Sequence, residues 1–592
     1  MRNEDISTTN GAAVISPADD VIAGSRGQWT ITYTAGPDGL AVGGSVRFEI
    51  PYGFTPPQFQ WHGDDGYVTV TCSRRDVRLQ LSLEPPVKLD PQPFYYVTRW
   101  GRMVYVQVPD QHLAEGDQIV FVYGRQLHSP VFGGAVAQHF AQTVEFTVAT
   151  DVDGTRGAKF SGYTLVADQP VLRVVGGPMS RRRFIMPSLV TAQREFPIRY
   201  LGLDEHGNAC PHPAQSGRDT LAVPGEYLLK DADEQHPIIA NPVVCLPREP
   251  DLQLFWGDIH GHTILSDGLG SPQDYYAFGR DEALLDFCAM ADHAQYMSDE
   301  DWELTQEVTR EFNAPGEYVT LLGYEYSCNA SLERYGDKCV YYPGDEGPLL
   351  RETDINRGPY HDMAEYAPTW KQHGAMMVLH QHARGTCTYY DPDLVRLCEV
   401  YSIWGNSENG EDPRLLLPAR NHDYSGHYAA DALAKGWLLG LIASSDDHAG
   451  RPGSTDWLRV SRAYPGGLVA VYARDLTREA IWDALWNRRC YGTTGARIIL
   501  QFEVDGEPMG SVIQGSAFRG GHQLRARVLG DQPLQSVAVV RGREVIHAER
   551  SFNCALQFAL RDDPPAGAAN YYYVRVVQEN GEMAWSSPVW IM

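Results

Sequence analysis

The sequence has little positive charge for its length and lacks the long apolar run that a membrane-spanning helix requires. Of its 592 residues, 49 are Lys or Arg and 75 are Asp or Glu, which gives a formal net charge of −26 at pH 7. Such an acidic chain is a poor match for the phosphate backbone of nucleic acids, so we expect no nucleic-acid partner. Because no apolar stretch of about 18 residues occurs, we expect no membrane partner either.

Cysteine is sparse and scattered. The ten cysteines include no Cys-x-x-Cys pair, which excludes a crowded disulfide framework and is typical of reduced thiols in a large core. The first ten residues also contain no apolar segment of the kind found in a signal peptide. We therefore expect a soluble, cytoplasmic protein.

Several common catalytic motifs are missing as well. The sequence contains no P-loop, no His-Glu-x-x-His, no glycine-rich dinucleotide fingerprint and no Gly-x-Ser-x-Gly elbow. These absences argue against the nucleotide-binding, zinc-protease and serine-hydrolase classes that carry these motifs. Any chemistry must come from another arrangement of side chains.

The pattern of apolar residues divides the chain into regions. Residues 1–165 alternate apolar and polar positions in short runs, such as Trp29–Tyr33, separated by Gly, Pro and Asp. This period of two predicts an N-terminal β-sandwich domain over 1–165. We expect a second β segment and a linker over 166–250. The alternation returns near the end of the chain and predicts a C-terminal β domain over 497–592.

The region 251–496 shows a different pattern, in which apolar runs alternate with helix-like segments. This alternation predicts parallel β/α architecture. Ser271 followed by Pro272, Ser298 and Asp475 are the predicted N-caps of three helices in this region.

Six apolar runs of this central region are each followed by side chains that bind metals. In chain order these side chains are His260 and His262, Asp292 and His293, Glu325, His380, Glu399, and Asp446 to His448. The carboxyl ends of parallel strands open on one face, so these groups are expected to converge. Burying them together without a metal would leave costly unpaired polar groups. The sequence therefore predicts a metal cluster.

Each of these strand endings also has a plainer interpretation. A lone His-x-His is more often a polar pair on a rim, and Asp or Ser after a strand commonly begins a loop. Their repetition along consecutive predicted strands favours the metal cluster. Imidazole and carboxylate ligands without thiolate suit Zn²⁺, Mn²⁺ or Fe²⁺ and do not select among them.

The ordered set of motifs resembles the polymerase and histidinol phosphatase (PHP) superfamily of metal-dependent hydrolases. The resemblance covers the central region and rests on His260-Gly-His262, Ser266-Asp267-Gly268, Asp292-His293, Glu325, His380 and Ser445–His448. Within that superfamily, four stretches resemble more specifically a poorly characterised multidomain subgroup with flanking β domains: Trp256–Thr263, Tyr491–Gly495, Pro508–Gly510 and Ala584–Trp590.

This resemblance implies a distorted (β/α)7 barrel over 251–496 that holds two or three divalent ions. It implies these ligands: His260, His262, Glu325 and Asp446 for one ion; Glu325 and His380 for a second; Asp267, His293 and His448 for a third. Glu399 stands where the superfamily has a further His or Cys. Glu399 and His382 are therefore rival candidates to complete the second ion's site.

The predicted function is hydrolysis of a phosphate ester in a small anionic organic substrate. In this prediction a metal-bridging water, held by Glu325 and Asp446, attacks the ester. Arg384 and Arg451 follow ligand motifs and are candidates to bind the anion, although Arg residues in so acidic a chain also pair with surface acids.

Two other functions stay open at this point. The same metal cluster could hydrolyse a C–N or C–O bond, as in amidohydrolase-like enzymes. Alternatively, the chain is a non-catalytic binding or scaffold protein with an inherited barrel. The β regions exceed half of the chain, so we expect at least one to shape the mouth of the site or a homo-oligomer interface.

Overall fold

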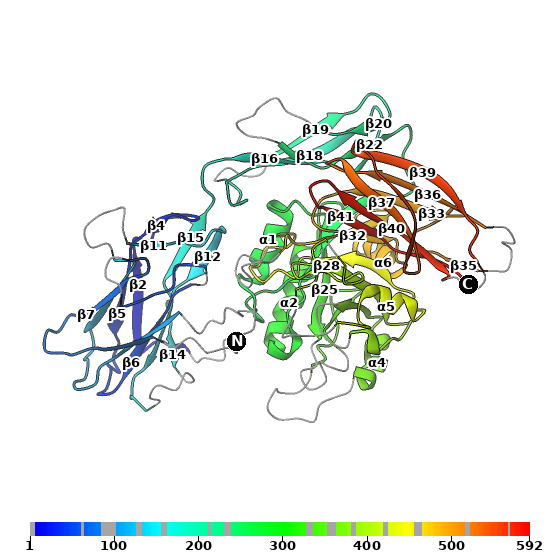
Figure 1. Cartoon of the computed structure of the whole chain (residues 1–592). Helices are drawn as coiled ribbons and strands as arrows, with labels where there is room; N and C mark the ends of the chain where they lie inside the picture. The colour runs from blue at the N-terminus through cyan, green and yellow to red at the C-terminus, as the bar shows by residue number, and fades with distance from the viewer. Residues whose placement is uncertain are drawn as a thin grey trace.

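The chain forms several strand-rich bodies with separate apolar cores, so it is a multidomain protein (Figure 1). The computed structural model describes residues 6–592 apart from a set of short segments. The residues that it does not describe are 1–5, 52, 61–63, 84–101, 126–132, 156–162, 211–214, 230–237, 327–335, 352–362, 381–385, 412, 418–423, 455–463, 515–520 and 566–568.

The N-terminal strands form two sheets that pack face to face. Their orders are β2-β5-β10-β7 and β1-β14-β13-β6-β9-β8. Phe48 of β6 stacks on Phe121 of β10 with ring centroids 4.7 Å apart, so the two sheets share one core. The strands are β1 (Ile6–Ser7), β2 (Gly11–Ser16), β5 (Trp29–Ala35), β6 (Ser45–Glu49), β7 (Val68–Cys72), β8 (Gln80–Leu83), β9 (Met103–Gln107), β10 (Gln118–Tyr123), β13 (Thr147–Asp151) and β14 (Thr164–Val166).

Smaller sheets connect these strands to the rest of the molecule (Figure 1). Their orders are β11-β4, β12-β15-β3, β19-β18-β16-β21 and β17-β22-β20. The strands are β3 (Val21–Ile22), β4 (Arg26–Gly27), β11 (Ala135–Val136), β12 (Gln142–Glu145), β15 (Val171–Val175), β16 (Arg181–Ile185), β17 (Leu189–Thr191), β18 (Glu195–Leu203), β19 (Gln215–Thr220), β20 (Gly225–Tyr227), β21 (Ile238–Ala240) and β22 (Val243–Leu246). An ion pair of 2.9 Å between Arg527 and Glu226 joins this region to the C-terminal strands.

The central strands run mainly parallel and are buried on both faces. β23, β24 and β25 pair in parallel, as do β27, β28 and β30, whereas β26 is antiparallel to both neighbours. Every residue of β25 is buried, as expected for a strand covered on both sides. The strands are β23 (Gln253–Asp258), β24 (Phe287–Ala289), β25 (Val319–Tyr326), β26 (Lys338–Tyr342), β27 (Met376–His380), β28 (Val395–Ser402), β29 (Gly405–Asn406) and β30 (Gly440–Ala443).

Helices lie between these strands in the chain. They are α1 (Pro272–Asp281), α2 (Asp299–Phe312), α4 (Met363–Gln372), α5 (Ala429–Ala434) and α6 (Arg478–Trp486), with the 3₁₀ turns η2 (Ala294–Tyr296) and η3 (Thr386–Thr388). The predicted caps Ser271 and Ser298 are confirmed, and each forms a capping box. The prediction for Asp475 is wrong, because the Thr477 side chain accepts the hydrogen bond from Ala480 N. None of the helices in the described part combines the length and apolar character of a membrane-spanning segment.

The central sheet continues without interruption into the C-terminal strands. β31 and β32 extend it antiparallel from β23, and β41, β40, β37 and β38 follow. Gly492 of β32 allows a close approach to β30, because a Cβ there would lie 2.5 Å from Ala443 N. These strands are β31 (Leu468–Ala473), β32 (Cys490–Thr493), β37 (Leu534–Arg541), β38 (Glu544–Glu549), β40 (Tyr571–Gln578), β41 (Met583–Ser586), with β35 (Val512–Ile513) and β42 (Val589–Ile591) beside them.

A separate C-terminal sheet has the order β34-β33-β36-β39. Its strands are β33 (Ile499–Val504), β34 (Glu507–Pro508), β36 (His522–Leu529) and β39 (Ala555–Asp562). The hydrogen-bonded pairing is that of a mixed, branched sheet and does not by itself show a closed (β/α)7 barrel. The (β/α)7 barrel and the domain limits at residues 165, 250 and 496 therefore stay predictions.

Candidate metal centre

The polar residues that follow the central strands come together at one end of the sheet. Among the described residues, three groups offer ligand atoms within 4.8 Å of one another and could hold a metal ion. These groups are His260 with His262 and Asp446; His260 with Glu325 and His380; and His262 with Asp267, His293 and His448. The strand ends thus place eight of the nine predicted ligand residues in one connected cluster, and Glu399 lies beside it.

The first group is built by the loops after β23 and β30. The Nε2 atom of His262 lies 3.0 Å from Asp446 Oδ1, and Nε2 of His260 lies 3.4 Å from the same oxygen. Asp446 has a φ of 55°, a left-handed conformation that non-glycine residues seldom adopt. Its N–H donates to the His260 carbonyl at 2.8 Å, so the two loops hold each other in place.

Glu325, near the end of β25, lies between the groups. Its Oε2 atom is 3.1 Å from His293 Nδ1, 3.4 Å from His262 Nε2 and 3.6 Å from His260 Nε2. One carboxylate oxygen therefore faces imidazoles that come from two different loops. This is the position that a bridging carboxylate needs.

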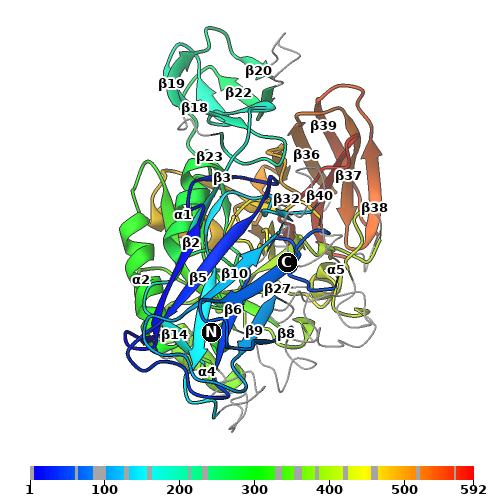
Figure 2. The ribbon, with the colours of Figure 1, turned by 90° about the vertical axis from the view of Figure 1, so that its left-hand side faces the viewer.

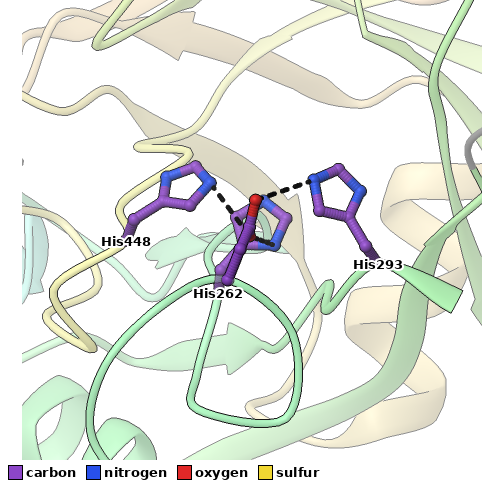
Figure 3. Close-up of side chains that lie close together, drawn as sticks. His262, His293 and His448 are labelled. Carbon is purple, nitrogen blue, oxygen red and sulfur yellow. Dashed lines mark ion pairs between the residues drawn. The ribbon is translucent and has the colours of Figure 1, made fainter. Parts of the chain in front are cut away.

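The third group surrounds the carboxylate of Asp267. His448 Nε2 lies 3.5 Å from one oxygen of Asp267, and His293 Nε2 lies 3.7 Å from the other. Figure 3 shows His262, His293 and His448 turned toward a common point. The rings of His262 and His448 stack with centroids 4.1 Å apart. His262 thus faces Asp446 through Nε2 and lies 3.9 Å from Asp267 through Nδ1.

Glu399 and His380 lie on the neighbouring strands β28 and β27. Glu399 Oε2 is 2.9 Å from His260 Nδ1, and Oε1 is 2.9 Å from His380 Nδ1. His380 Nε2 lies 3.4 Å from Asp446 Oδ2. Glu399 belongs to none of the three groups of candidate ligands in the described part of the chain.

The cluster is buried except on one side. His260 is 0% exposed and Glu325 1%, whereas the side chains of His293 and Asp267 are 15% and 23% exposed. The cluster therefore reaches solvent through its third group.

Burial and charge shift the pKa values of the cluster in opposite directions. Burial alone would raise the pKa of Glu325 and Asp446, but the surrounding imidazoles outweigh it and lower both. Burial alone would lower the pKa of His260 and His380, but the neighbouring acidic groups raise both well above the usual value. The acidic and basic side chains of the cluster therefore favour each other's charged forms.

The residues present fit divalent cations. His260 Nε2 and Glu325 Oε1 are buried and have no hydrogen-bond partner among the described residues. Leaving a buried polar atom unsatisfied costs about 1 to 3 kcal/mol, so both atoms are poorly explained by packing alone. Nitrogen and carboxylate donors without thiolate match Zn²⁺, Mn²⁺ or Fe²⁺.

Two buried aspartates support the loops that carry the cluster. Asp258 accepts hydrogen bonds from the N–H groups of His260, Ser445 and Gly453, and burial raises its pKa to about 6. Asp292 accepts from both the N–H and hydroxyl of Thr263 and from the Ser266 hydroxyl. Sequence reasoning missed Asp258, although it directly precedes Ile259-His260 at the end of β23.

Two further residues near the cluster, Cys339 and Trp404, were not among the site residues predicted from the sequence. Cys339 lies opposite Glu325 in the β25–β26 ladder, and its pKa is raised, mainly by burial. No motif surrounds Cys339, so only the pairing of the two strands reveals it. Trp404, which follows β28, donates its indole N–H to Asp446 Oδ2 at 2.5 Å.

Of the two predicted anion-binding arginines, Arg451 lies within the described residues and Arg384 does not. Arg451 is 3% exposed; its Nη1 atom donates to Asn208 Oδ1 at 2.6 Å and its guanidinium lies over the Phe278 ring. To bind a substrate anion, it would have to leave these contacts. Arg384 and the rival ligand His382 fall within 381–385, outside the described residues.

Asn208 joins three parts of the chain at this place. Besides accepting from Arg451, its Oδ1 accepts from Ala141 N at 2.8 Å and its Nδ2 donates to the His139 carbonyl at 2.9 Å. Gln142 of β12 also donates to the carbonyl of Ala449, next to His448. The N-terminal strands, which lie in front of the central ones in Figure 2, therefore contact a loop of the cluster.

Comparisons with known proteins give distant relatives. The model of a family described as a protein of unknown function (DUF3604) matches residues 443–507. An uncharacterized protein of Chlamydia pneumoniae is 24% identical over 536 residues, covering 81% of this chain and 84% of that protein. An uncharacterized protein of Chlamydia trachomatis is 25% identical over 402 residues, covering 62% of each chain.

One solved structure with partial similarity comes from Bacteroides vulgatus. It is described as a two-domain protein containing a predicted PHP-like metal-dependent phosphoesterase, with 15% identity and a TM-score of 0.30, covering 58% of this chain and 97% of that one. Likenesses at this level assign no activity to this chain. The cluster of candidate ligands is therefore the feature that indicates a function.

Proposed function

We propose that this protein is a metal-dependent hydrolase that cleaves a phosphate ester in a small anionic organic substrate. The observation that carries the proposal is the connected set of three ligand groups, which share His260 and His262 and surround Glu325. We also propose that the strands from β23 to β32 form the distorted (β/α)7 barrel that the PHP resemblance implies.

The proposed ligands follow the three groups. One ion would take His260, His262, Glu325 and Asp446, a second Glu325 and His380, and a third Asp267, His293 and His448. When bound, divalent ions supply Lewis-acid chemistry: they lower the pKa of water and stabilise negative charge on a reacting oxygen. Zn²⁺, Mn²⁺ and Fe²⁺ all suit these donors.

The chain's own carboxylates would orient the attacking water by accepting hydrogen bonds from it. Neighbouring imidazoles hold the pKa of Glu325 and Asp446 below their usual values, so both are ionised at neutral pH. Glu325 Oε1 is buried without a hydrogen bond to any described residue, so it is available to accept one from that water. Asp446 is held by the Trp404 indole on one oxygen and faces His262 with the other.

Divalent cations bound at the cluster would attract an anionic substrate. Asp267, Glu325, Asp446 and Glu399 carry four negative charges, which two divalent cations would balance and which three would exceed. The substrate would approach the third group, because His293 and Asp267 are the most exposed members. The buried side chains around the first group would keep bulk water out of the reaction.

Elemental analysis and a substrate screen test the proposal together. The purified protein is reconstituted with Mn²⁺ or Zn²⁺ and assayed with phosphomonoesters, phosphodiesters, amides and lactones. The double variant His260→Ala/His262→Ala is expected to lose both bound metal and turnover. The matched control His112→Ala/His373→Ala removes two exposed imidazoles and should keep both.

The outcomes separate the rival functions. Full activity in the His260→Ala/His262→Ala variant would contradict a metal-dependent reaction at this site. Turnover of amides or lactones alone would replace phosphate esters by C–N or C–O bonds as the target. A protein that takes up no metal after reconstitution would be better described as a binding or scaffold protein.

A further inference from the structure

We infer that Glu399 is a positioning residue, which orients the imidazoles of His260 and His380 for metal binding, rather than a metal ligand itself. The inference rests on the proposed metal-dependent function. It differs from the prediction from sequence, in which Glu399 and His382 are rival candidates to complete the second ion's site.

The backbone brings Glu399 to both histidines. Glu399 pairs with His380 in the parallel ladder between β28 and β27, so their side chains start on the same face. Its two oxygens then divide between two rings: Oε2 lies 2.9 Å from His260 Nδ1, and Oε1 lies 2.9 Å from His380 Nδ1. All three side chains are at most 3% exposed, so water does not compete for these hydrogen bonds.

These hydrogen bonds determine which ring nitrogen carries the proton. Each oxygen of Glu399 lies 2.9 Å from one of the two Nδ1 atoms, and an ionised carboxylate only accepts hydrogen bonds. Both Nδ1 atoms must therefore donate. In a neutral imidazole the proton on Nδ1 leaves the lone pair on Nε2, which is then the atom able to bind a metal.

The Nε2 atoms of both rings point toward the same carboxylate. His260 Nε2 lies 3.4 Å from Asp446 Oδ1, and His380 Nε2 lies 3.4 Å from Asp446 Oδ2. Glu399 thus holds the two rings from behind while their Nε2 atoms face the candidate ligands Asp446 and Glu325. To bind an ion directly, Glu399 would have to give up at least one of its two hydrogen bonds to these rings.

The variant Glu399→Gln tests this role with little change of shape. An amide has one accepting oxygen and one donating nitrogen, so it cannot accept from both Nδ1–H groups. One ring would lose its partner or change tautomer. Removing such a supporting carboxylate typically lowers metal affinity about 10- to 100-fold.

The experiment measures Zn²⁺ affinity and stoichiometry by competition with a chelator, together with the crystal structure of the Zn²⁺-loaded wild-type protein. We expect the Glu399→Gln variant to bind the same number of ions as wild type at saturation, but about 10- to 100-fold more weakly. The matched control is Glu582→Gln. Glu582 also accepts two hydrogen bonds, from Arg414 and Thr494, but lies outside the cluster, so this variant should bind Zn²⁺ like wild type.

Other outcomes would overturn the inference about Glu399, the proposed hydrolase function or both. A Glu399 oxygen at about 2.0 to 2.2 Å from a zinc ion, or the loss of one ion at saturation in Glu399→Gln, would make it a ligand and overturn the inference. Unchanged affinity in Glu399→Gln would overturn it as well. Weaker binding in a protein that hydrolyses none of the substrates would support the positioning role and refute the proposed hydrolase. A wild-type protein that binds no Zn²⁺ would overturn both.

Discussion

Glu408 and Glu325 are both buried, but they differ in the hydrogen bonds that their carboxylate oxygens accept. Glu408 is 1% exposed, and both of its oxygens accept hydrogen bonds from the C-terminal strands. The donors are the Tyr573 hydroxyl at 2.6 Å, Arg575 Nη1 at 3.0 Å and the Trp585 indole at 2.7 Å. This network joins the segment after β28 to β40 and β41.

Glu325 is equally buried, but one of its oxygens lacks a hydrogen-bond donor among the described residues. Oε1 of Glu325 and Nε2 of His260 have no hydrogen-bond partner among the described residues. A complete buried network holds two parts of a fold together, whereas buried groups left without partners mark a place where something else is expected to bind. The comparison separates a structural carboxylate from one available for a ligand.

The largest effect on stability is expected for Glu408→Leu. The change leaves Arg575, Tyr573 and Trp585 without their acceptor, and removing one partner of a buried ion pair costs about 3 to 5 kcal/mol. Because the Arg575 side chain is 20% exposed, we expect the lower end of that range. Urea unfolding measures it, with the exposed Glu411→Leu as control. A loss similar to that of the control would contradict the structural role of Glu408.

The second largest effect is expected for the stabilisation of the folded state by bound metal. A ligand present at 100 times its dissociation constant stabilises the folded state by about 2.7 kcal/mol. We expect Zn²⁺ to stabilise the wild-type protein by this amount and to stabilise Glu325→Gln far less, as measured by urea unfolding with and without metal. The Glu408→Leu variant should retain the stabilisation by Zn²⁺. Equal stabilisation of Glu325→Gln and wild type would remove the distinction between the two carboxylates.

A smaller effect is expected where the N-terminal strands contact the cluster. Asn208→Leu removes the acceptor for the buried guanidinium of Arg451, and a hydrogen bond to a charged group contributes about 1.5 to 3 kcal/mol. The exposed Asn570→Leu is the control and should lose little. Thermal unfolding of the two variants measures the difference, and an equal loss in both would contradict the assigned contacts.

The smallest effect is expected for Gln142→Ala. This change removes one neutral hydrogen bond of 3.3 Å to the Ala449 carbonyl, which corresponds to about 0.5 to 1.5 kcal/mol. Chemical unfolding with Gln111→Ala, an N-terminal glutamine that lies away from the cluster, as a comparison measures it. A change larger than that of Asn208→Leu would mean that Gln142, and not Asn208, is the main contact between these regions.

The candidate ligands and their positions after the strands could be predicted from local patterns in the sequence. Apolar runs ending in His260, Glu325 and His380 are local patterns, and the alternation along Trp29–Ala35 and the capping boxes at Ser271 and Ser298 are local as well. Signals of this kind are carried by a few neighbouring residues, so they can be recognised without knowing the fold.

The contacts of several of these residues could not be predicted from the sequence, because their partners are distant along the chain. Arg451 meets Asn208, which lies 243 positions away in the sequence, and Glu399 turns toward His260, 139 positions away. Cys339 lies opposite Glu325 only because β26 pairs with β25. The partner of a polar side chain depends on how distant segments pack, and no pattern within a few residues contains that information.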